Sequence, residues 1–250
     1  MTQLQNKIAI VTGGASGFGA GIVRAYLQEG ARVVIADINV EAARHLAREL
    51  GPQASAIGCD VTNAEQVCAA VAHCVAHFGV PDVVVNNAGT TYRNQPMLDV
   101  DEATFDRVFA VNVKSIFHMA HAVVPLMRAR QSGVILNIGS VAGIRPRPGL
   151  TWYNSSKGAV NLLSKSMAIE LAPDQIRVNA ICPVMGVTAM LEDFMGAPDT
   201  PENRARFIAS IPLGRLAEPA DIANVAVFLA SDAAAFLTGL EMPVDGGRVI

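Results

Sequence analysis

The sequence alternates short apolar runs with longer amphipathic stretches along its whole length, and this alternation limits the folds that it can adopt. The apolar runs are nearly free of polar residues, as expected of strands buried on both faces of a sheet. Such strands are predicted at residues 7–11, 32–37, 54–58, 82–86, 133–138, 176–181 and 241–244. Helices are predicted at residues 17–28, 41–50, 64–78, 101–129, 153–171 and 220–230. Strands alternating with helices predict a doubly wound parallel α/β sheet of the Rossmann type, with helices on both faces.

No repeat or linker divides the 250 residues, so we predict one domain over residues 1–250. Residues 1–135 are expected to form mainly the cofactor-binding half, and residues 136–250 the catalytic and substrate half. The least regular stretch interleaves Gly, Pro and Met over residues 184–212. This composition predicts a flexible flap beside a site rather than a linker.

Charge and composition argue against several classes of protein. The net charge is −3 and no basic stretch suggests a nucleic acid or an anionic membrane as partner. The apolar runs are expected to fall short of a bilayer span, and we expect no signal peptide. Since 51% of the residues are hydrophobic, a buried interface between subunits is plausible.

Cysteine and histidine usage predicts no metal site and a cytoplasmic protein. Cys59, Cys68, Cys74 and Cys182 form no Cys-x-x-Cys pair, so they are interpreted as core thiols in a reducing compartment. The pair at residues 73 and 77 places two histidines on one helix face, but no third ligand stands nearby.

A glycine-rich segment directly follows the first predicted strand and opens the first helix. Gly13 permits a tight turn, while Gly17 and Gly19 carry no Cβ where a phosphate and a packed strand must approach. The helix N-terminus then offers free N–H groups to a pyrophosphate. The spacing Gly-x-x-x-Gly-x-Gly in this context predicts a dinucleotide site, although an ordinary strand-to-helix turn can have the same pattern.

Asp37 ends the second predicted strand, twenty residues after Gly17. A carboxylate at this place can accept both ribose hydroxyls of adenosine and would repel a 2′-phosphate. No Arg or Lys stands at residues 38–39 or 14–16 to attract that phosphate. The sequence therefore predicts NAD rather than NADP as cofactor; the alternative is that Asp37 only starts a surface turn.

Tyr153 and Lys157 are one helical turn apart, so both side chains lie on one helix face, and Ser140 stands thirteen residues upstream. A tyrosine with an ordinary pKa near 10 is a poor base at neutral pH. The cation of Lys157 and an oxidised nicotinamide would lower that pKa, so Tyr153 could act as general base or acid. Ser140 would hydrogen-bond the substrate oxygen. Alone, the pair could equally be a core tyrosine with a lysine reaching to solvent.

Together these segments resemble the short-chain dehydrogenase/reductase family over essentially the whole chain. Further motifs of that family follow in its order: Asp60-Val61, Asn86-Asn87-Ala88-Gly89, Asn112, Thr238-Gly239 and Val244-Asp245-Gly246-Gly247. The resemblance implies that Lys157 also binds the nicotinamide ribose and that Asn112 anchors a water passing protons to Lys157. The implied catalytic residues are Asn112, Ser140, Tyr153 and Lys157. The expected cofactor residues are Gly13, Ser16, Gly17, Phe18, Gly19, Asp37, Asp60, Val61, Asn87, Ala88, Gly89, Tyr153, Lys157, Pro183, Gly186 and Thr188.

One residue departs from the family pattern. The family usually has Pro-Gly after the sixth strand, and this chain has Pro183-Val184. Pro183 and Thr188 still fit positions that contact the nicotinamide carboxamide and the cofactor phosphates. Val184 places a branched side chain where bare backbone is usual, which is expected to narrow this part of the pocket.

The resemblance implies an NAD-dependent oxidoreductase that transfers a hydride between NAD(H) and a secondary alcohol or ketone, and a homotetramer. One alternative is a dinucleotide-binding regulator or scaffold without turnover. Another is an epimerase or dehydratase of the related extended family, whose members usually have a larger C-terminal domain.

The loop between Ser140 and Tyr153 must lie near the substrate, because both its flanks carry candidate catalytic groups. This loop contains Arg145 and Arg147, and Arg93 follows the Asn-Asn-Ala-Gly segment on a second loop. Since arginine suits carboxylate, sulfonate or phosphate groups, we hypothesise a substrate with an anionic group beside its alcohol. Alternatively, these arginines are solvated or pair with acids of a neighbouring subunit. Candidate apolar lining residues are Leu150, Val184, Met185, Met190, Phe194 and Met195. The Met and Phe residues among them could equally pack the flap against the body of the protein.

Overall fold

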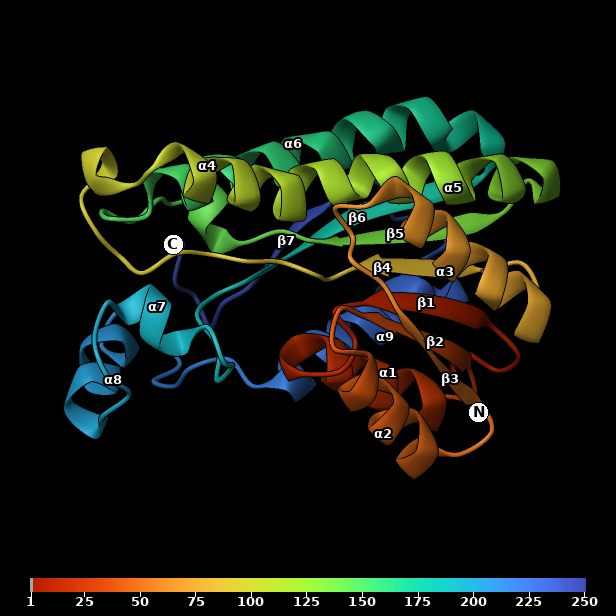
Figure 1. Ribbon diagram of the computed structural model, residues 1–250, viewed down its shortest axis with the longest axis horizontal. Coiled ribbons are helices and arrows are strands. Elements are labelled where there is room, and N and C mark those ends of the chain that lie inside the picture. Colours follow the sequence, from red (N-terminus) through yellow and green to blue (C-terminus); the bar gives the residue numbers. More distant parts are fainter. Residues whose placement is uncertain (1) are drawn as a thin grey trace.

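A single seven-stranded parallel sheet runs through the middle of the computed structural model, which describes residues 2–250 (Figure 1). The strand order is β3-β2-β1-β4-β5-β6-β7. The strands are β1 (Ile8–Thr12), β2 (Arg32–Asp37), β3 (Ala54–Gly58), β4 (Val83–Asn86), β5 (Gly133–Ile138), β6 (Ile176–Pro183) and β7 (Glu241–Val244). The predicted fold class, a doubly wound parallel sheet with helices on both faces, is therefore confirmed.

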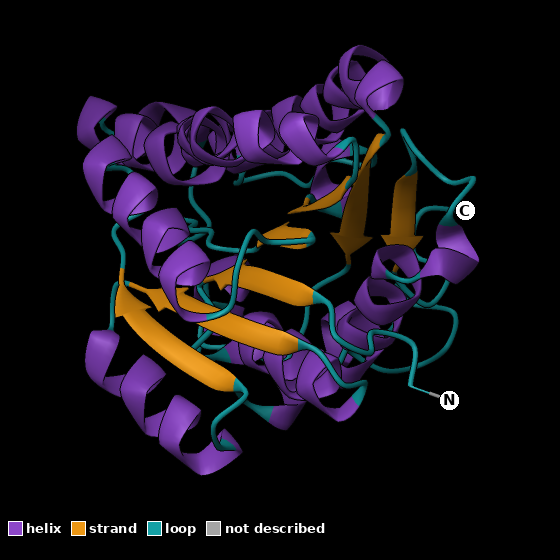
Figure 2. Ribbon diagram, turned by 90° about the vertical axis from the view of Figure 1, so that its right-hand side faces the viewer, coloured by secondary structure: helices purple, strands orange, loops and turns teal. Residues whose placement is uncertain are grey.

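Helices cover both faces of the sheet, as Figures 1 and 2 show. The α-helices are α1 (Gly17–Gln28), α2 (Val40–Leu50), α3 (Ala64–His77), α4 (Glu102–Phe109), α5 (Ser115–Arg130), α6 (Thr151–Leu171), α7 (Leu191–Met195), α8 (Pro201–Ile208) and α9 (Pro219–Ala230). The remaining turns are η1 (Met97–Asp99), η2 (Ala110–Lys114), η3 (Val141–Gly143), η4 (Ala172–Asp174) and η5 (Asp232–Ala234).

Alternating side chains of each strand supply two separate hydrophobic cores. In β1, Ala9 and Val11 pack with residues of α1, α2 and α9, while Ile8 and Ile10 pack with residues of α3, α5 and α6. All five residues of β1 are buried. This two-sided burial explains why the strands are continuous apolar runs in the sequence rather than alternating ones.

The expected long helix over residues 101–129 is divided by η2, a π-helical turn that contains Asn112. The whole stretch Glu102–Arg130 is long and apolar enough to cross a membrane by length and composition, with a mean hydropathy of 1.2 in its most apolar window. This differs from the expectation that no segment would reach that length. One face of the stretch buries Met119, Val123 and Met127 against the sheet, and such packing demands the same apolar composition.

The segment expected to be an irregular flap, residues 184–212, contains the short helices α7 and α8. Helix α8 begins where Thr200 accepts a hydrogen bond from the Asn203 N–H at 3.3 Å and Pro201 occupies the first turn. In Figure 1 these two helices lie beyond the ends of β6 and β7, away from the two main helical layers. They thereby form one wall of the region outside the carboxyl ends of the strands.

Strand order reverses between β1 and β4, because the chain runs outward from β1 to β3 before it returns to β4. Loops at the carboxyl ends of these two strands lead to opposite sides of the sheet. In open α/β sheets a ligand crevice forms at such a switch point. The fold therefore places the glycine turn after β1 beside the Asn-Asn-Ala-Gly segment after β4.

Candidate active site

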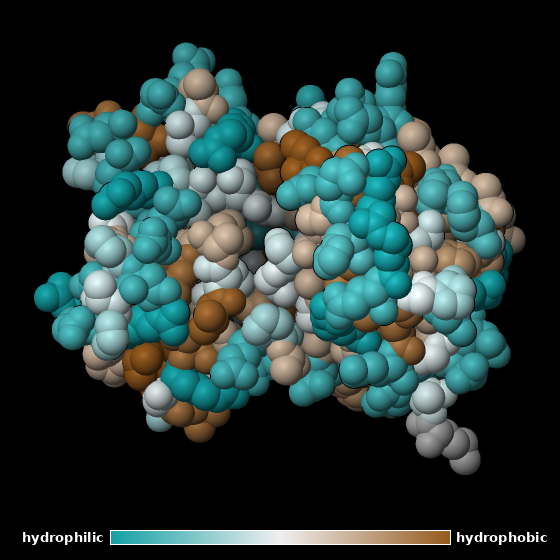
Figure 3. Space-filling model, turned by 60° about the horizontal axis from the view of Figure 1, so that its bottom comes forward, coloured by the Kyte–Doolittle hydropathy of each residue, from teal (hydrophilic) through white to brown (hydrophobic). Residues whose placement is uncertain are grey.

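A cavity of about 900 Å³ lies at the carboxyl ends of the strands. Figure 3 shows a hollow opening between the two halves of this face of the molecule. Most of the predicted cofactor residues line the cavity: Gly13, Ser16, Gly17, Phe18, Asp37, Asp60, Val61, Asn87, Ala88, Gly89, Tyr153, Lys157, Pro183, Gly186 and Thr188. Of the predicted site residues, Gly19, Arg93 and Asn112 do not line it, and Ser140 does.

The glycine turn after β1 leaves backbone space that a side chain would fill. Gly13 has a φ of +59°, and a Cβ there would lie 2.9 Å from the Cα of Ala88. Gly17 has a φ of +52° and faces Thr188 across the cavity wall. Gly19 instead packs against the turn, since its Cβ would lie 2.1 Å from the Gly13 carbonyl oxygen. The turn is therefore closed tightly on itself and open on the cavity side.

Helix α1 begins at this turn without a side-chain cap. Ser16 occupies the N-cap in an extended conformation, makes no capping hydrogen bond, and no acidic residue stands in the first turn. The first N–H groups of a helix need partners from outside the helix, and its positive dipole end favours an anion. These uncapped N–H groups beside Gly17 and Thr188 fit the pyrophosphate of a dinucleotide.

Asp37 stands at the end of β2 with only 8% of its surface exposed. Its two carboxylate oxygens accept hydrogen bonds from the Ala15 N–H at 3.0 Å and the Asn39 N–H at 2.9 Å. These bonds hold the carboxylate at the cavity wall, where both remaining lone-pair directions can serve a ligand. The geometry fits a ribose diol.

The segment after β4 is bonded to the end of β1. Asn87 donates from Nδ2 to the carbonyl oxygens of Thr12 and Gly13, both at 2.9 Å. The Thr12 hydroxyl accepts the N–H groups of Asn87 and Ala88 at 3.0 and 3.1 Å. These bonds fix the two cavity-lining loops to each other across the switch point.

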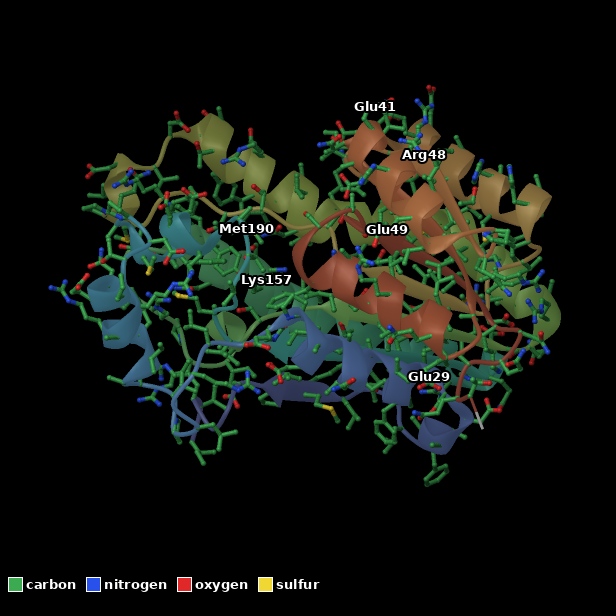
Figure 4. All side chains as sticks on the ribbon, turned by 90° about the horizontal axis from the view of Figure 1, so that it is seen from below. Glu29, Glu41, Arg48, Glu49, Lys157 and Met190 are labelled. Atoms are coloured by element: carbon green, nitrogen blue, oxygen red, sulfur yellow. The ribbon has the colours of Figure 1, made fainter. Side chains whose placement is uncertain are left out.

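Ser140, Tyr153 and Lys157 meet in one wall of the cavity. Ser140 follows β5 and lies at the start of η3, where its hydroxyl accepts the Ala142 N–H at 3.0 Å. Tyr153 and Lys157 project from the first turns of α6 and are 7% and 5% exposed. The Lys157 Nζ donates to the Ile138 carbonyl oxygen at 2.8 Å and lies 6.0 Å from the centre of the Tyr153 ring. In Figure 4 the label of Lys157 lies between the red helix α1 and the light-blue helix α7, just below the label of Met190.

Burial governs the proton affinities of these two groups. It raises the pKa of Tyr153 to about 12, while hydrogen bonding with Ser140 and the charge of Arg147 act to lower it. Burial also lowers the pKa of Lys157 to about 8. Arg147 is thus a second cation that acts on the phenol, in addition to Lys157, whose Nζ lies 6.0 Å from the ring centre.

Asn112 is buried in the π-helical turn η2, behind the cavity wall. Its Oδ1 accepts the Thr90 N–H at 2.8 Å, and its Nδ2 donates to the Thr90 carbonyl oxygen and the Ser156 hydroxyl, both at 3.0 Å. A Cβ at Gly89 would approach both the Asn112 Oδ1, at 3.4 Å, and the Lys157 Nζ, at 3.6 Å. Asn112 and Lys157 therefore both border Gly89, and no direct hydrogen bond joins these two side chains.

Val184, in place of the glycine that the resemblance implies, lines the cavity and is 9% exposed. It is absent from the residues with positive φ within residues 2–250, so its backbone tolerates a side chain without strain. Its N–H donates to the Val244 carbonyl oxygen at 3.2 Å. The branched side chain therefore occupies cavity space at low conformational cost.

Two of the three arginines predicted at the substrate site lie in the cavity wall, and one lies outside it. Arg145 and Arg147 line the cavity, as the sequence predicted, whereas Arg93 is exposed outside it and donates to the Gly196 carbonyl oxygen at 3.2 Å. The structure adds Arg248 and Phe207 to the wall, which sequence reasoning missed. Arg248 directly follows the C-terminal glycine motif, and that position was a signal from which its place in the cavity wall could have been predicted. The sequence pattern of α8 contains no comparable signal for Phe207. The predicted apolar residues Leu150, Val184, Met185, Met190, Phe194 and Met195 all line the cavity.

Within residues 2–250 no group of three or more His, Cys, Asp or Glu side chains is placed to hold a metal ion. His73 and His77 stack with ring centres 3.9 Å apart, and the His73 Nε2 is hydrogen-bonded to the Ser55 hydroxyl at 2.7 Å. These contacts account for the pair at i and i+4.

Comparison with known proteins places this geometry among oxidoreductases. A family model described as enoyl-(acyl carrier protein) reductase matches residues 13–248. The chain is 49% identical to a 4-formylbenzenesulfonate dehydrogenase of Comamonas testosteroni, over 99% of each chain. It is 38% identical to a 7alpha-hydroxysteroid dehydrogenase of Escherichia coli K12, over 99% of this chain and 96% of the relative. A crystal structure of a 3-ketoacyl-(acyl-carrier-protein) reductase from Brucella melitensis complexed with NADH superimposes with a TM-score of 0.94 at 41% identity, covering 99% of this chain and 100% of the other.

Proposed function

This chain belongs to the short-chain dehydrogenase/reductase family, and from that premise we propose that it transfers a hydride between NAD(H) and a secondary alcohol or ketone. The family uses NAD(P), and the relatives are named as dehydrogenases of an aldehyde and a hydroxysteroid. The observation that carries the proposal is the placement of Ser140, Tyr153 and Lys157 in the wall of the cavity that the glycine turn lines.

Tyr153 is proposed to exchange the proton of the substrate hydroxyl through its phenol oxygen. In oxidation it accepts this proton while the carbon loses a hydride, and in reduction it returns the proton to the alkoxide. Ser140 is proposed to hydrogen-bond the substrate oxygen and hold it near the phenol, because both side chains face the cavity. When bound, the oxidised nicotinamide accepts the hydride and adds positive charge that favours the phenolate.

Lys157 is proposed to supply the positive charge beside the phenol and to bind the nicotinamide ribose. With a pKa of about 8 it is mostly protonated at pH 7, and its Nζ retains further donors beyond the bond to Ile138. Asn112 is proposed to act through a water toward Lys157, which its position behind Gly89 supports. Asp37 supports a preference for NAD, because its carboxylate lines the cavity and would repel a 2′-phosphate bound beside it.

We further propose a cytoplasmic homotetramer. The outer sides of α5 and α6 carry exposed apolar side chains: Phe117 is 56% exposed, Leu162 66% and Ile169 80%. Apolar residues gathered on adjacent helices favour burial between subunits.

A screen of the purified protein tests the proposed activity. The protein with NAD⁺ is mixed with a panel of secondary alcohols, hydroxysteroids and polyols, and with NADH and the corresponding ketones, while the absorbance of reduced cofactor is followed. We expect cofactor-dependent turnover of at least one member in both directions. Tight binding of NADH without turnover of any alcohol, aldehyde or ketone would instead favour a regulatory role.

A further inference from the structure

Arg147 projects a guanidinium into the substrate side of the cavity. Its planar group lies over the Phe207 ring, with 4.6 Å between the guanidinium carbon and the ring centre. Its Nη2 donates to the Phe194 carbonyl oxygen at 3.4 Å, which is a long bond. Guanidinium has five N–H donors, so this single bond leaves most of its donor capacity without a protein acceptor among residues 2–250.

This cation has no carboxylate partner among residues 2–250. Eight ion pairs join side chains within that range, and none includes Arg145, Arg147 or Arg248. Arg248, which carries the same sign, acts on Arg147, and the group that opposes it is the Tyr153 phenol rather than a carboxylate. Burial and Arg248 both lower the pKa of Arg147, which signals a positive charge that lacks compensation.

Charge in the cavity is divided by sign. Asp37 and Asp60 are its acidic lining residues, and both stand at the carboxyl ends of β2 and β3, where the adenosine half of a dinucleotide fits. The part near Tyr153 instead holds the three arginines within an apolar wall. That wall includes Leu150, Met190, Phe194, Met195, Phe207 and Ile211.

The three arginines differ in what they can do. The Arg145 Nη1 donates to the Arg248 carbonyl oxygen at 2.9 Å, so Arg145 is a positioning residue that holds the C-terminal segment against the cavity. The backbone of Arg147 is itself fixed, because its carbonyl oxygen accepts from the Asn154 Nδ2 at 2.7 Å at the start of α6. The helix that carries the phenol thus fixes the backbone of Arg147, and the charge of the Arg147 guanidinium acts on that phenol.

We propose that Arg147, with the adjacent charge of Arg248, binds a carboxylate or sulfonate group on an otherwise apolar substrate whose carbinol carbon faces Tyr153. This inference rests on the proposed function and names its substrate class. Arginine in an apolar wall favours such a group because its N–H fork matches two oxygens of one anion. A neutral substrate would leave the buried cation uncompensated, and this penalty creates specificity.

Binding without turnover tests the anion site directly. Benzenesulfonate and benzenesulfonamide have nearly the same shape and differ in charge, and each is titrated calorimetrically into the full-length protein with saturating NADH. We expect benzenesulfonate to bind at least tenfold more tightly, the lower end of what a hydrogen-bonded charge pair contributes. Equal affinities for the two compounds would overturn the proposal.

Variants locate the effect. Arg147→Met keeps an apolar stem over Phe207 and removes the charge, so it should abolish the difference between the two compounds. Arg206→Met removes an equal charge from the exposed side of α8 and should keep the difference. Arg147→Lys retains charge without the fork and should give an intermediate ratio, and it also serves if the methionine variant does not fold. A full difference retained in Arg147→Met would overturn the proposal.

Kinetics separate this inference from the proposed function. The kcat/KM for 4-(1-hydroxyethyl)benzoate should exceed that for 4-(1-hydroxyethyl)benzamide at least tenfold, and the ratio should fall toward one in Arg147→Met. Turnover of both alcohols at equal kcat/KM would refute the anion site and leave the oxidoreductase activity intact. Selective binding of benzenesulfonate without turnover of any alcohol would refute the activity and leave the anion site intact.

Discussion

Replacement of Asp37 should remove the discrimination between the two nicotinamide cofactors. The side chain is 8% exposed, lines the cavity, and is held by the Ala15 and Asn39 N–H groups, so it cannot turn away from a ligand at this place. A 2′-phosphate brought beside it would meet a fixed negative charge. We therefore expect the wild-type protein to bind NAD(H) more tightly than NADP(H).

The magnitude follows from the charges. Two unit charges about 4 Å apart repel by about 1 kcal/mol in water and about 4 kcal/mol near a protein surface. A phosphate monoester carries about 1.5 to 2 negative charges at pH 7. Even the weak end of this range exceeds about 1.4 kcal/mol, so NADH should bind at least tenfold more tightly than NADPH.

Isothermal titration with NADH and NADPH measures this ratio in each variant. Asp37→Ala should bring the two affinities within about threefold, and adding Ile38→Arg should favour NADPH, since Ile38 is 75% exposed and free to reach a phosphate. Ile38→Arg alone is the matched control and should keep a preference for NADH. Asp37→Ala leaves two backbone N–H groups without their acceptor, which costs about 1–3 kcal/mol of stability, but the ratio is internal to each variant.

Two results would refute this reasoning. Equal affinity of the wild-type protein for NADH and NADPH would mean that Asp37 does not face the 2′-position. An unchanged preference in Asp37→Ala would place the discrimination in other residues.

Three further expectations concern stability, cofactor binding and assembly. Lys157→Met should lose turnover. In denaturant titrations at pH 7 its free energy of unfolding should exceed that of the wild type by of order 1–3 kcal/mol, because burial lowers the pKa of Lys157 to about 8. Between pH 8 and about 10.4 the unfolded wild-type chain binds more protons than the folded one, so the stability of the wild type rises with pH. The stability advantage of Lys157→Met should therefore shrink as the pH rises through that window, and an advantage that grows with pH would contradict this expectation. Gly13→Ala places a Cβ 2.9 Å from the Ala88 Cα and should abolish NADH binding in titrations. Gly51→Ala is the matched control, because Gly51 also has a positive φ, of +88°, but a Cβ there meets nothing within 4 Å; this variant should keep the wild-type NADH affinity. Light scattering at micromolar concentration should give a mass well above 26.3 kDa, and Phe117→Glu with Ile169→Glu should reduce it; a wild-type monomer would exclude the tetramer.

Local sequence patterns were sufficient to predict the strands of the sheet and the boundaries of most helices. The uninterrupted apolar runs identified the strands because a parallel sheet covered on both faces demands apolar side chains at every position, as β1 illustrates. The predicted starts and ends mostly lie within two residues of those observed, since Gly51 after α2 and the N-caps Asn39 and Asn63 are strong local signals.

Features set by tertiary contacts were not predictable from local pattern. Helix α7 has five residues, too few to show a helical period, and is held where its neighbours place it. The π-helical turn around Asn112 satisfies bonds to Thr90 and Ser156, which are distant in sequence. The apolar periodicity therefore predicted one continuous helix over residues 101–129, whereas the structure interrupts it with the π-helical turn η2.

The site was predictable where one turn of chain holds its chemistry, and less so where distant segments meet. Tyr153 and Lys157 share one helix face, so their spacing alone brought them together. Arg248 and Phe207 reach the cavity from the C-terminal segment and from α8, and no spacing relates them to Arg147. Arg93, predicted to reach the same opening, instead binds Gly196 outside the cavity.

The proposed role of Tyr153 is tested most directly by removing its hydroxyl and measuring turnover and cofactor binding on the same protein. Tyr153→Phe keeps the ring and should lower kcat at least a hundredfold, the usual scale of general acid–base catalysis, with the dissociation constant of NADH changed less than threefold. Tyr92→Phe is the matched control: its hydroxyl accepts the Trp152 N–H at 3.1 Å outside the cavity lining, so that variant should keep its kcat. If Tyr153→Phe retains most of the wild-type kcat, Tyr153 is not the proton carrier and the proposed mechanism is wrong.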